Sequence, residues 1–440
     1  MFGTSGIRGP VGETVSADLA LSVGRALGID ADRVVVGRDP RESGRFLLDA
    51  LTAGLRESGT DVIDLGVAAT PTVARAVRSE DGDAGVVITA SHNPPADNGI
   101  KLWQPTTQAF DTERQETIAE RIEAAEFDPA AWDELGTRRR RDHTDAHVEA
   151  ILDAVDVSSP PDVIVDLGNG AGGVSVDALT RLGCDVETLN AQPDGAFPGR
   201  PSEPTAENCA SLTALARETG RLGIAHDGDA DRLRAVTEDG EFLGGDTLLA
   251  ILAREAADPG ESIAAPVNTS LAVDDYLAAD DIDVVRTRVG DVSVAERASE
   301  TGVAFGGEPS GAWIWPTQAL CPDGPLAAAK LVELAAERAL ADRVADVEAY
   351  PIHRDSVSVT DKRGVMERVR GVVHDRYEDV TTLDGVRVDL GDAWFLLRAS
   401  GTQPLVRITA EARDPERAST VFEEARTLLT ETSERERSGG

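Results

Sequence analysis

The sequence predicts an α/β protein whose last part has a different, α+β organisation. Three observations predict this. Short apolar runs rich in β-branched residues alternate with helical stretches, which is typical of parallel α/β units. The alternation starts again after Pro160-Pro161 and a third time from Asp246. The final part instead carries three strand-like runs close together, followed by one helix.

The length of 440 residues suggests about three domains, and the pattern along the chain refines this to four. We place the boundaries near Asp145, Gly245 and Tyr350. The predicted domains therefore cover residues 1–145, 146–245, 246–350 and 351–440.

The elements follow in chain order. In the first domain we expect strands over residues 34–36, 62–65 and 86–89, with helices over 46–58 and 72–78. In the second, an apolar strand over 163–167 leads into the glycine-rich stretch 168–173 and a helix. The third has strands at 284–285 and 303–305 after a helical start at Asp246. The last has strands over 384–389, 393–397 and 405–410, then a helix from 415 to 430.

The composition excludes several classes of partner. Acidic residues number 79 against 43 basic ones, giving a net charge of -36, so nucleic acid is not expected to bind. This charge and the 4% aromatic content indicate adaptation to high salt. Cys184, Cys209 and Cys321 have no spacing for zinc or a disulfide framework. Without an apolar signal core or a run of about 18 apolar residues, we expect a cytoplasmic protein with no membrane partner.

A serine at the end of a predicted strand is the first candidate for chemistry. The apolar run over residues 85–90 stops at Ser91, and a loop of Asn, Pro, Asp and Gly then ends on Lys101, one of only three lysines. Lysine can act as a general acid or base when its surroundings lower its pKa. A turn or helix-capping role is the plainer interpretation of Ser91, and the Gly-x-Ser-x-Gly pattern of serine hydrolases is missing. His92 is a further candidate, although we expect it to face away from any partner of Ser91.

Alternating aspartates form the best candidate for a metal site. Asp227, Asp229 and Asp231 can point three hard oxygen ligands to one side of a short turn, as Mg²⁺ prefers. An EF-hand loop that begins at Asp227 is excluded, because its sixth position is Arg232 rather than glycine. Strands, not helices, are also expected on both sides of the loop. A solvated acidic turn is the alternative.

Two further loops carry polar groups. Glu308 and Ser310 offer an acceptor and a donor for vicinal sugar hydroxyls, unless residues 306–311 form an ordinary glycine turn. The last domain holds a possible phosphate cradle, although a hairpin turn with paired arginines is as good an interpretation. The cradle would consist of Arg398, Ser400, Gly401, Thr402 and Arg407. The basic run over residues 138–141 is expected to be a surface segment paired with nearby acids.

Taken together, these four loops resemble the α-D-phosphohexomutase superfamily over essentially the whole chain. Residues 89–94 look like its phosphoserine loop, 227–232 like its Mg²⁺ loop, 307–311 like its sugar-binding loop and 398–404 like its phosphate-binding loop. The resemblance implies four domains around a central cleft, three similar and one smaller. It also implies that Ser91 is carried as a phosphoserine with Arg8 and Lys101 beside it.

The same resemblance implies an isomerase that moves a phosphoryl group between hexose 1- and 6-phosphates. Phosphoserine 91 donates to a hexose monophosphate, giving a hexose 1,6-bisphosphate as intermediate or activator. One Mg²⁺ per chain is held by the three aspartates and a phosphoserine oxygen, and Arg8, His92 or Lys101 assists as a catalytic residue. Arg232 contacts the transferring phosphate, Glu308 and Ser310 hold the sugar, and the last-domain loop grips the other phosphate. The small-molecule partner is thus a sugar phosphate, and a monomer or homodimer is expected.

The preferred sugar depends on smaller features. Many relatives continue the sugar loop as Gly-Glu-x-Ser-Gly-His, whereas Ala312 and Trp313 follow Gly311 here. The opening stretch 2–9 and residues 287–291 look most like the phosphoglucosamine mutase branch and its archaeal relatives, which favours glucosamine phosphate. Glucose or mannose phosphate is the alternative. A phosphoserine-type sugar phosphatase and a non-catalytic sugar-phosphate sensor are the hypotheses from other classes.

Overall fold

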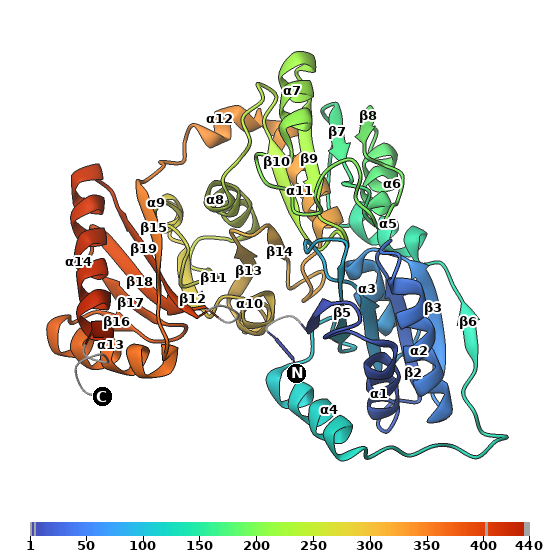
Figure 1. The fold of residues 1–440 in the computed structure, drawn as a ribbon. Coiled ribbons are helices and arrows are strands. Elements are labelled where there is room, and N and C mark those ends of the chain that lie inside the picture. Colours follow the sequence, from blue (N-terminus) through green and yellow to red (C-terminus); the bar gives the residue numbers. More distant parts are fainter. Residues whose placement is uncertain (1, 4–5, 401–403, 435–440) are drawn as a thin grey trace.

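The computed structural model describes residues 2–3, 6–400 and 404–434 and arranges them around four sheets (Figure 1). Helices pack against each of the first three sheets. The fourth sheet lies at one end of the molecule with its own pair of helices. The predicted fold class is thereby confirmed. No helix among the described residues is both long and apolar enough to span a membrane.

The first sheet has six strands in the order β1-β5-β4-β2-β3-β6. Strands β4, β2, β3 and β6 run parallel, while β1 and β5 are antiparallel to their neighbours. The bounds are β1 (Ile7–Pro10), β2 (Arg33–Arg38), β3 (Asp61–Val67), β4 (Ala84–Ile88), β5 (Asp97–Trp103) and β6 (Arg138–Arg140). Its helices are α1 (Ala17–Leu27), α2 (Gly44–Glu57), α3 (Thr70–Ser79) and α4 (Thr112–Ala124).

Alternation along the strands explains why both faces of this sheet are covered. Val34 and Val36 point into one apolar cluster with α1 and α2, whereas Val35 points into the other with α3. A strand that is apolar on both faces must be buried between helices. The predicted strands and helices of this part are confirmed, while α1, α4, β1, β5 and β6 were not predicted.

The second and third sheets have four strands each and share one apolar core. The second has the order β10-β9-β7-β8, from β7 (Val163–Asp166), β8 (Val186–Leu189), β9 (Leu222–His226) and β10 (Leu233–Val236). The third has the order β12-β11-β13-β14, from β11 (Ser262–Pro266), β12 (Asp283–Thr287), β13 (Val303–Glu308) and β14 (Ala312–Ile314). Their helices are α5 (Thr144–Leu152), α6 (Gly173–Arg181), α7 (Ala210–Thr219), α8 (Gly245–Ala256), α9 (Leu271–Ala278), α10 (Asp291–Ala298), α11 (Gly324–Glu337) and α12 (Leu340–Val344).

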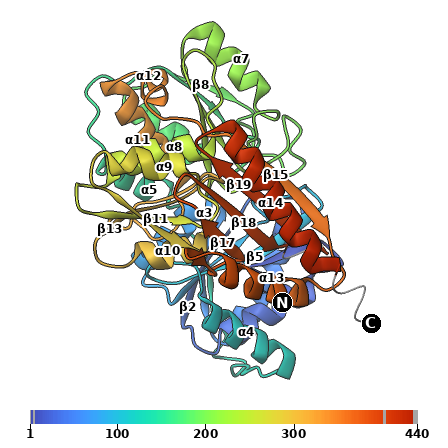
Figure 2. The same ribbon diagram turned by 90° about the vertical axis from the view of Figure 1, so that its left-hand side faces the viewer.

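The fourth sheet is antiparallel throughout, in the order β15-β19-β18-β17-β16. Its strands are β15 (Ile352–Ser358), β16 (Val380–Thr381), β17 (Val386–Asp389), β18 (Ala393–Ala399) and β19 (Leu405–Ala412). Helices α13 (Lys362–Arg376) and α14 (Pro415–Glu434) bury one face in an apolar cluster with the sheet (Figure 2). The three strands and the final helix predicted for the tail are confirmed; β15, β16 and α13 were not predicted.

The predicted domain boundaries stay a proposal. The first falls inside α5, the second at the start of α8 and the third between α12 and β15. Helix α11, late in the third predicted domain, belongs to the apolar cluster that also includes residues of α5 and α6. The second and third parts are therefore packed together more intimately than a simple division suggests.

Candidate active site

One cleft of about 270 Å³ is lined by residues from all four sheets or their loops. Its walls come from polar loops at the ends of sheet strands and from residues within neighbouring strands. The predicted site residues that line this cleft are Arg8, Ser91, His92, Lys101, Asp231, Arg232, Glu308, Ser310 and Arg398.

Ser91 lies directly beyond β4 and is only 1% exposed. Its backbone adopts a left-handed conformation with φ 52°, and its amide donates to Thr89 Oγ1 at 2.8 Å. Its hydroxyl donates to Asp227 Oδ2 at 2.5 Å, which joins the serine loop to the aspartate loop. The serine is therefore held in one orientation toward the carboxylates.

His92 faces Ser91 itself, whereas the sequence predicted only that it faces away from any partner of Ser91. Its Nδ1 lies 3.3 Å from Ser91 Oγ. Burial and the charges of Arg232 and Arg8 lower the pKa of His92 to about 3. The imidazole is thus neutral at neutral pH and lies against Ser91 Oγ.

Arg41, which the sequence analysis missed, supports the whole serine loop. Its guanidinium is fully buried, pairs with Asp39 at 3.0 Å and stacks over the Phe197 ring at 4.9 Å. Asp39 in turn accepts from Thr89 Oγ1 at 2.7 Å. The remaining guanidinium donors go to four loop carbonyls, those of Ser91, Asn93, Pro94 and Asp97. Its only sequence signal is its position after β2, the strand beside β4.

The three aspartates are close enough to share one cation. Asp227, Asp229 and Asp231 are all buried, and each offers an oxygen within 4.8 Å of the others. The Oδ1 atoms of Asp229 and Asp231 are buried without a hydrogen-bond partner. Since a buried acceptor that lacks a partner is destabilising, these two orphaned oxygens fit a bound cation.

The charges of the cluster lead to the same conclusion. Burial, together with the negative charges of its two neighbours, raises the pKa of Asp227 well above its ordinary value. Burial and Asp229 likewise raise the pKa of Asp231. For Asp229, burial is outweighed by Lys101 and by the Thr70 hydroxyl, so its pKa is lowered. A divalent cation would remove the mutual repulsion that these shifts express.

The surroundings of Lys101 differ from those that the sequence-based argument expected. It is 4% exposed on β5, donates to Asp229 Oδ2 at 2.9 Å and also pairs with Asp231. Burial disfavours its charge, but the two carboxylates outweigh burial and raise its pKa above the ordinary value. The surroundings therefore hold Lys101 charged, instead of lowering its pKa as the sequence-based argument required.

The predicted sugar loop is a tight hairpin between β13 and β14. Glu308 is buried, accepts from the Gly290 amide at 2.7 Å and lies 3.3 Å from the hydroxyl of Ser310. Burial and Asp291 raise the pKa of Glu308. The hairpin docks on the aspartate loop, because residues Arg232 and Ala312 form a β-bridge.

Two more polar residues of the third part line the cleft, and the sequence did not single out either as a ligand. Asn268 follows β11, and its Oδ1 is buried without a hydrogen-bond partner. Asp291 begins α10 beside Glu308. Their position after parallel strands, at the same edge as the other loops, was the available signal.

The predicted phosphate cradle is only partly brought together. Arg398 lines the cleft and lies 3.2 Å from Asp384. Arg407 is exposed and directly opposite Arg398 on the neighbouring strand, but it does not line the cleft. Ser400 is buried near the end of β18, and its carbonyl accepts from Lys362 Nζ at 2.5 Å. Gly401 and Thr402 lie outside the described residues.

Four family models, described as domains I, II and III and the C-terminal domain of phosphoglucomutase/phosphomannomutase, match residues 1–129, 145–240, 244–350 and 356–428. The chain belongs to the phosphoglucomutase/phosphomannomutase family. It is accordingly an isomerase of the phosphohexomutase type, as predicted.

The chain is similar over nearly its full length to archaeal relatives within this family. The chain is 45% identical to a probable phosphoglucosamine mutase of Methanococcoides burtonii, covering 98% of this chain and 99% of that one. It is 46% identical to a probable phosphoglucosamine mutase of Methanopyrus kandleri, covering 96% of each. A crystal structure of a phosphoglucomutase/phosphomannomutase family protein from Burkholderia thailandensis superposes with a TM-score of 0.88 at 29% identity, over 98% of both chains.

Proposed function

We propose that this chain interconverts glucosamine 1-phosphate and glucosamine 6-phosphate through a phosphoserine at Ser91 and a glucosamine 1,6-bisphosphate. The observation that carries the proposal is the Ser91 hydroxyl, 2.5 Å from Asp227 in a cleft lined from all four parts of the chain. A cleft enclosed in this way can hold both ends of a bisphosphate. The naming of the full-length archaeal relatives supports the choice of sugar.

The reaction consists of two matched phosphoryl transfers. In the first, the bond between phosphorus and Ser91 Oγ breaks while a bond forms between phosphorus and the free hydroxyl oxygen of the hexose monophosphate. The proton of that hydroxyl passes, in net terms, to Ser91 Oγ. The bisphosphate then turns round, and its other phosphoryl group returns to Ser91 by the reverse exchange.

We assign the proton transfer to one of three groups of the cleft wall. They are Nδ1 of His92, which lies 3.3 Å from Ser91 Oγ, Nζ of Lys101 and the guanidinium of Arg8. Lys101, charged between two aspartates, and Arg232 also supply positive charge near the transferring group. We assign Arg232 to the transferring phosphate.

Asp227, Asp229, Asp231 and an oxygen of phosphoserine 91 would hold one Mg²⁺. All of these ligands are hard oxygens, and two of the aspartates have an orphaned buried oxygen. When bound, this ion neutralises charge on the transferring phosphoryl group. A hexose 1,6-bisphosphate that phosphorylates Ser91 would serve as activator.

The walls opposite Ser91 would bind the parts of the substrate that do not react. Glu308 and Ser310 hold sugar hydroxyls, and the fourth part grips the remote phosphate through Arg398, Ser400, Gly401, Thr402 and Arg407. Only a clamp remote from the chemistry lets the bisphosphate bind either way round.

The carboxylates of the third part favour an amino sugar. Glu308 and Asp291 both line the cleft. Glucosamine carries an ammonium group at neutral pH, whereas glucose and mannose carry a neutral hydroxyl there. Charge complementarity therefore supports glucosamine phosphate over the alternative, a phosphomannomutase or phosphoglucomutase.

Three broader properties are part of the proposal. The three cysteines are free and buried, which fits a reducing cytoplasm. Neither a nucleic-acid partner nor a membrane partner is expected at a net charge of -36. The chain would act as a monomer or a homodimer.

A competition assay tests the sugar and the reaction type together. Glucosamine, glucose and mannose 1-phosphates are offered in equal amounts with Mg²⁺ at high salt, while kcat/KM and free phosphate are followed. We expect the highest kcat/KM for glucosamine 1-phosphate and no accumulation of free phosphate. Preference for another sugar would refute the substrate, and dominant phosphate release would indicate a sugar phosphatase instead.

A further inference from the structure

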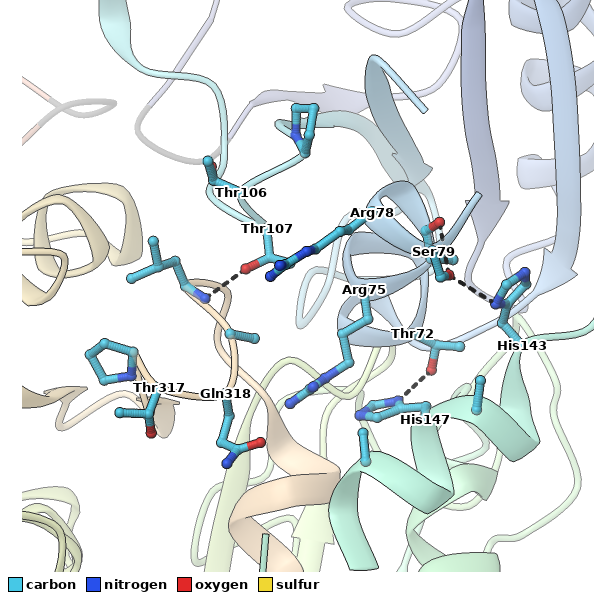
Figure 3. Close-up of a pocket in the computed structure, with 17 residues that line it drawn as sticks. Thr72, Arg75, Arg78, Ser79, Thr106, Thr107, His143, His147, Thr317 and Gln318 are labelled. Carbon is cyan, nitrogen blue, oxygen red and sulfur yellow. Dashed lines mark hydrogen bonds between the residues drawn. The ribbon is translucent and has the colours of Figure 1, made fainter. Parts of the chain in front are cut away.

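A second cavity, of about 470 Å³, lies where three parts of the chain meet. It shares no lining residue with the Ser91 cleft. Its walls are α3, the turn at residues 105–107 after β5, the start of α5 and the segment 316–320 between β14 and α11 (Figure 3). We call it the junction pocket.

The lining of the junction pocket has the opposite charge to the rest of the chain. Its 17 residues include Arg75, Arg78, His143 and His147 but not one aspartate or glutamate. Acidic residues number 79 of the 440 in the chain, whose net charge is -36. A cavity free of carboxylates in such a protein is suited to an anion.

The two arginines have hydrogen-bond donors to spare. Arg75 donates through Nε to Asp323 Oδ2 at 2.9 Å; its buried Nη2 and its Nη1 have no hydrogen-bond partner among the described residues, and Nη1 is the more accessible of the two. Arg78 is exposed at the pocket, and its guanidinium has no hydrogen bond or ion pair among the described residues. Both side chains extend from α3 toward the segment 316–320 (Figure 3).

The nearby acids are already engaged behind the wall. Asp323 accepts from Arg75 and lies 3.1 Å from His147 Nε2. Glu80 lies 2.7 Å from His143 Nε2. These carboxylates are engaged with Arg75 and the two histidines, and Arg78 stays uncompensated at the opening.

Neutral polar groups complete the wall across from the arginines. The side chains of Thr106, Thr317 and Gln318 have no hydrogen-bond partner within the described parts of the chain. Pro105 and Pro316 stiffen the two turns that carry them. Hydroxyl and amide groups facing guanidinium groups match a ligand with sugar hydroxyls at one end and a phosphate at the other.

We propose that the junction pocket binds a phosphorylated, hydroxyl-bearing metabolite of about the size of a pentose or hexose phosphate. The cavity volume falls in the range of about 300–1,000 Å³ that is usual for small-molecule sites. The phosphate would lie against Arg75 and Arg78, and Gln318 and the threonines would contact the hydroxyls. The site goes beyond the proposed reaction and does not depend on it.

Such a ligand would touch elements that also shape the active site. Helix α3 begins at Thr70, whose hydroxyl donates to Asp229 Oδ2 at 2.6 Å. The segment 316–320 continues from β14, the second strand of the predicted sugar loop. Binding in the junction pocket would therefore link α3 to the third part of the chain.

Binding of ribose 5-phosphate to the full-length protein tests the proposal. Titration calorimetry at constant ionic strength compares the wild type with Arg78→Gln and Gln318→Glu, both at exposed positions where folding is not at risk. Arg370→Gln and Gln192→Glu make the same changes at exposed sites outside the pocket. Arg78→Gln removes a charge-assisted hydrogen bond, and Gln318→Glu adds a repulsive charge. Each pocket variant should therefore weaken the binding of ribose 5-phosphate at the junction pocket by about tenfold or more.

We expect both control variants to bind like the wild type. Ribose without phosphate should not bind, and inorganic phosphate should bind more weakly than ribose 5-phosphate. Wild-type affinity and stoichiometry in both pocket variants would overturn the proposal. Equal affinity for inorganic phosphate would overturn the assignment of a metabolite. Since turnover is not measured, failure of the proposed mutase reaction leaves this test intact.

Discussion

Arg41 shows how a single residue positions chemistry that it does not perform. Its guanidinium binds Asp39 and four carbonyls of the serine loop, from Ser91 to Asp97. A lysine ammonium has fewer donors and no planar fork, so it cannot make this set of bonds. The serine loop should therefore lose its fixed geometry when Arg41 is replaced by lysine.

For Arg41→Lys we expect kcat to fall about 100-fold, because small displacements of a reacting group have large effects on rate. The free energy of unfolding should fall by about 3 kcal/mol, since a buried charge pair is disrupted. Steady-state kinetics and denaturant unfolding measure the two effects. Arg45→Lys, at an exposed position of the same segment, serves as control. An unchanged kcat in Arg41→Lys would show that the serine loop keeps its geometry without the Arg41 guanidinium.

A second residue-scale prediction concerns the metal. For Asp229→Asn we expect Mg²⁺ affinity to drop by about 100-fold or more, because one of three anionic ligands is lost. Calorimetric titration of the unphosphorylated protein with MgCl2 measures it. Asp177→Asn, on the exposed side of α6, is the matched control. Equal affinity in Asp229→Asn and wild type would refute the ligand assignment.

The sequence singled out residues whose loop carried its own spacing. Ser91 and the alternating aspartates stood out in this way, and the structure places Ser91 against Asp227. The orientation of His92 could not be predicted, because it depends on the left-handed backbone of Ser91. The pKa of Lys101 depends on two aspartates more than a hundred residues away. Contacts of this kind exist only in the folded chain.

At the scale of elements, helix α11 depends on a buried charge at its first turn. Asp323 caps the helix by accepting from the Leu326 amide at 3.0 Å, and it also binds Arg75 and His147. Burial disfavours its charge, but His147 and Arg75 outweigh burial and lower its pKa. Because the folded-state pKa lies below the unfolded value, the charged form stabilises the fold above about pH 3.9 and loses this effect as pH falls further.

Asp323→Asn keeps a capping oxygen and removes the charge. We expect its free energy of unfolding to be about 3 kcal/mol below that of the wild type at neutral pH. This difference should shrink as pH falls below about 4, because the carboxylate of the unfolded wild-type chain then takes up a proton while the folded one still resists it. Urea unfolding over a pH series measures it, with Asp177→Asn as control. A difference that does not change with pH would mean that charge is not what Asp323 contributes.

Two of the strands that the sequence did not predict share a physical cause. Strand β6 consists of three arginines with no apolar residue, paired with Asp49 and Asp64 as the sequence analysis expected of a surface segment. Strand β5 begins with Asp97-Asn98-Gly99, which is typical of a loop. Both strands form because a neighbouring strand offers hydrogen bonds, a tertiary effect without a local pattern.

At the scale of the whole molecule, the fourth part is fixed to the third through Glu411. This carboxylate is 1% exposed and accepts from Ser270 Oγ at 2.6 Å, the Leu271 amide at 2.8 Å and Trp394 Nε1 at 2.6 Å. Arg387 stacks over the Trp394 ring and donates to the Val267 carbonyl at 2.6 Å. The joint connects β19 and β18 to the start of α9.

For Glu411→Gln we expect the free energy of unfolding to fall by about 2 kcal/mol, because charge-assisted hydrogen bonds weaken and one donor now faces an amide. Glu416→Gln, exposed on α14, is the control and should match the wild type. Denaturant unfolding followed by tryptophan fluorescence measures both. An unchanged transition in Glu411→Gln would show that the two parts are held by other contacts.

The four-part architecture could be predicted from the order of the loops, but the packing between parts could not. The apolar surfaces of α5, α6 and α11 merge into one core that no local periodicity announces. The junction pocket likewise consists of residues from three separated stretches that show no pattern until they meet. Long-range packing is the feature that is hardest to predict from a single sequence.

The central claim is that Ser91 carries the phosphoryl group. Intact-protein mass spectrometry of wild type and Ser91→Ala, after incubation with glucose 1,6-bisphosphate and Mg²⁺, tests it most directly. We predict that the wild type gains one phosphoryl group and loses it when a hexose monophosphate is added, while Ser91→Ala gains none. Phosphorylation of Ser91→Ala to the same extent would contradict the account.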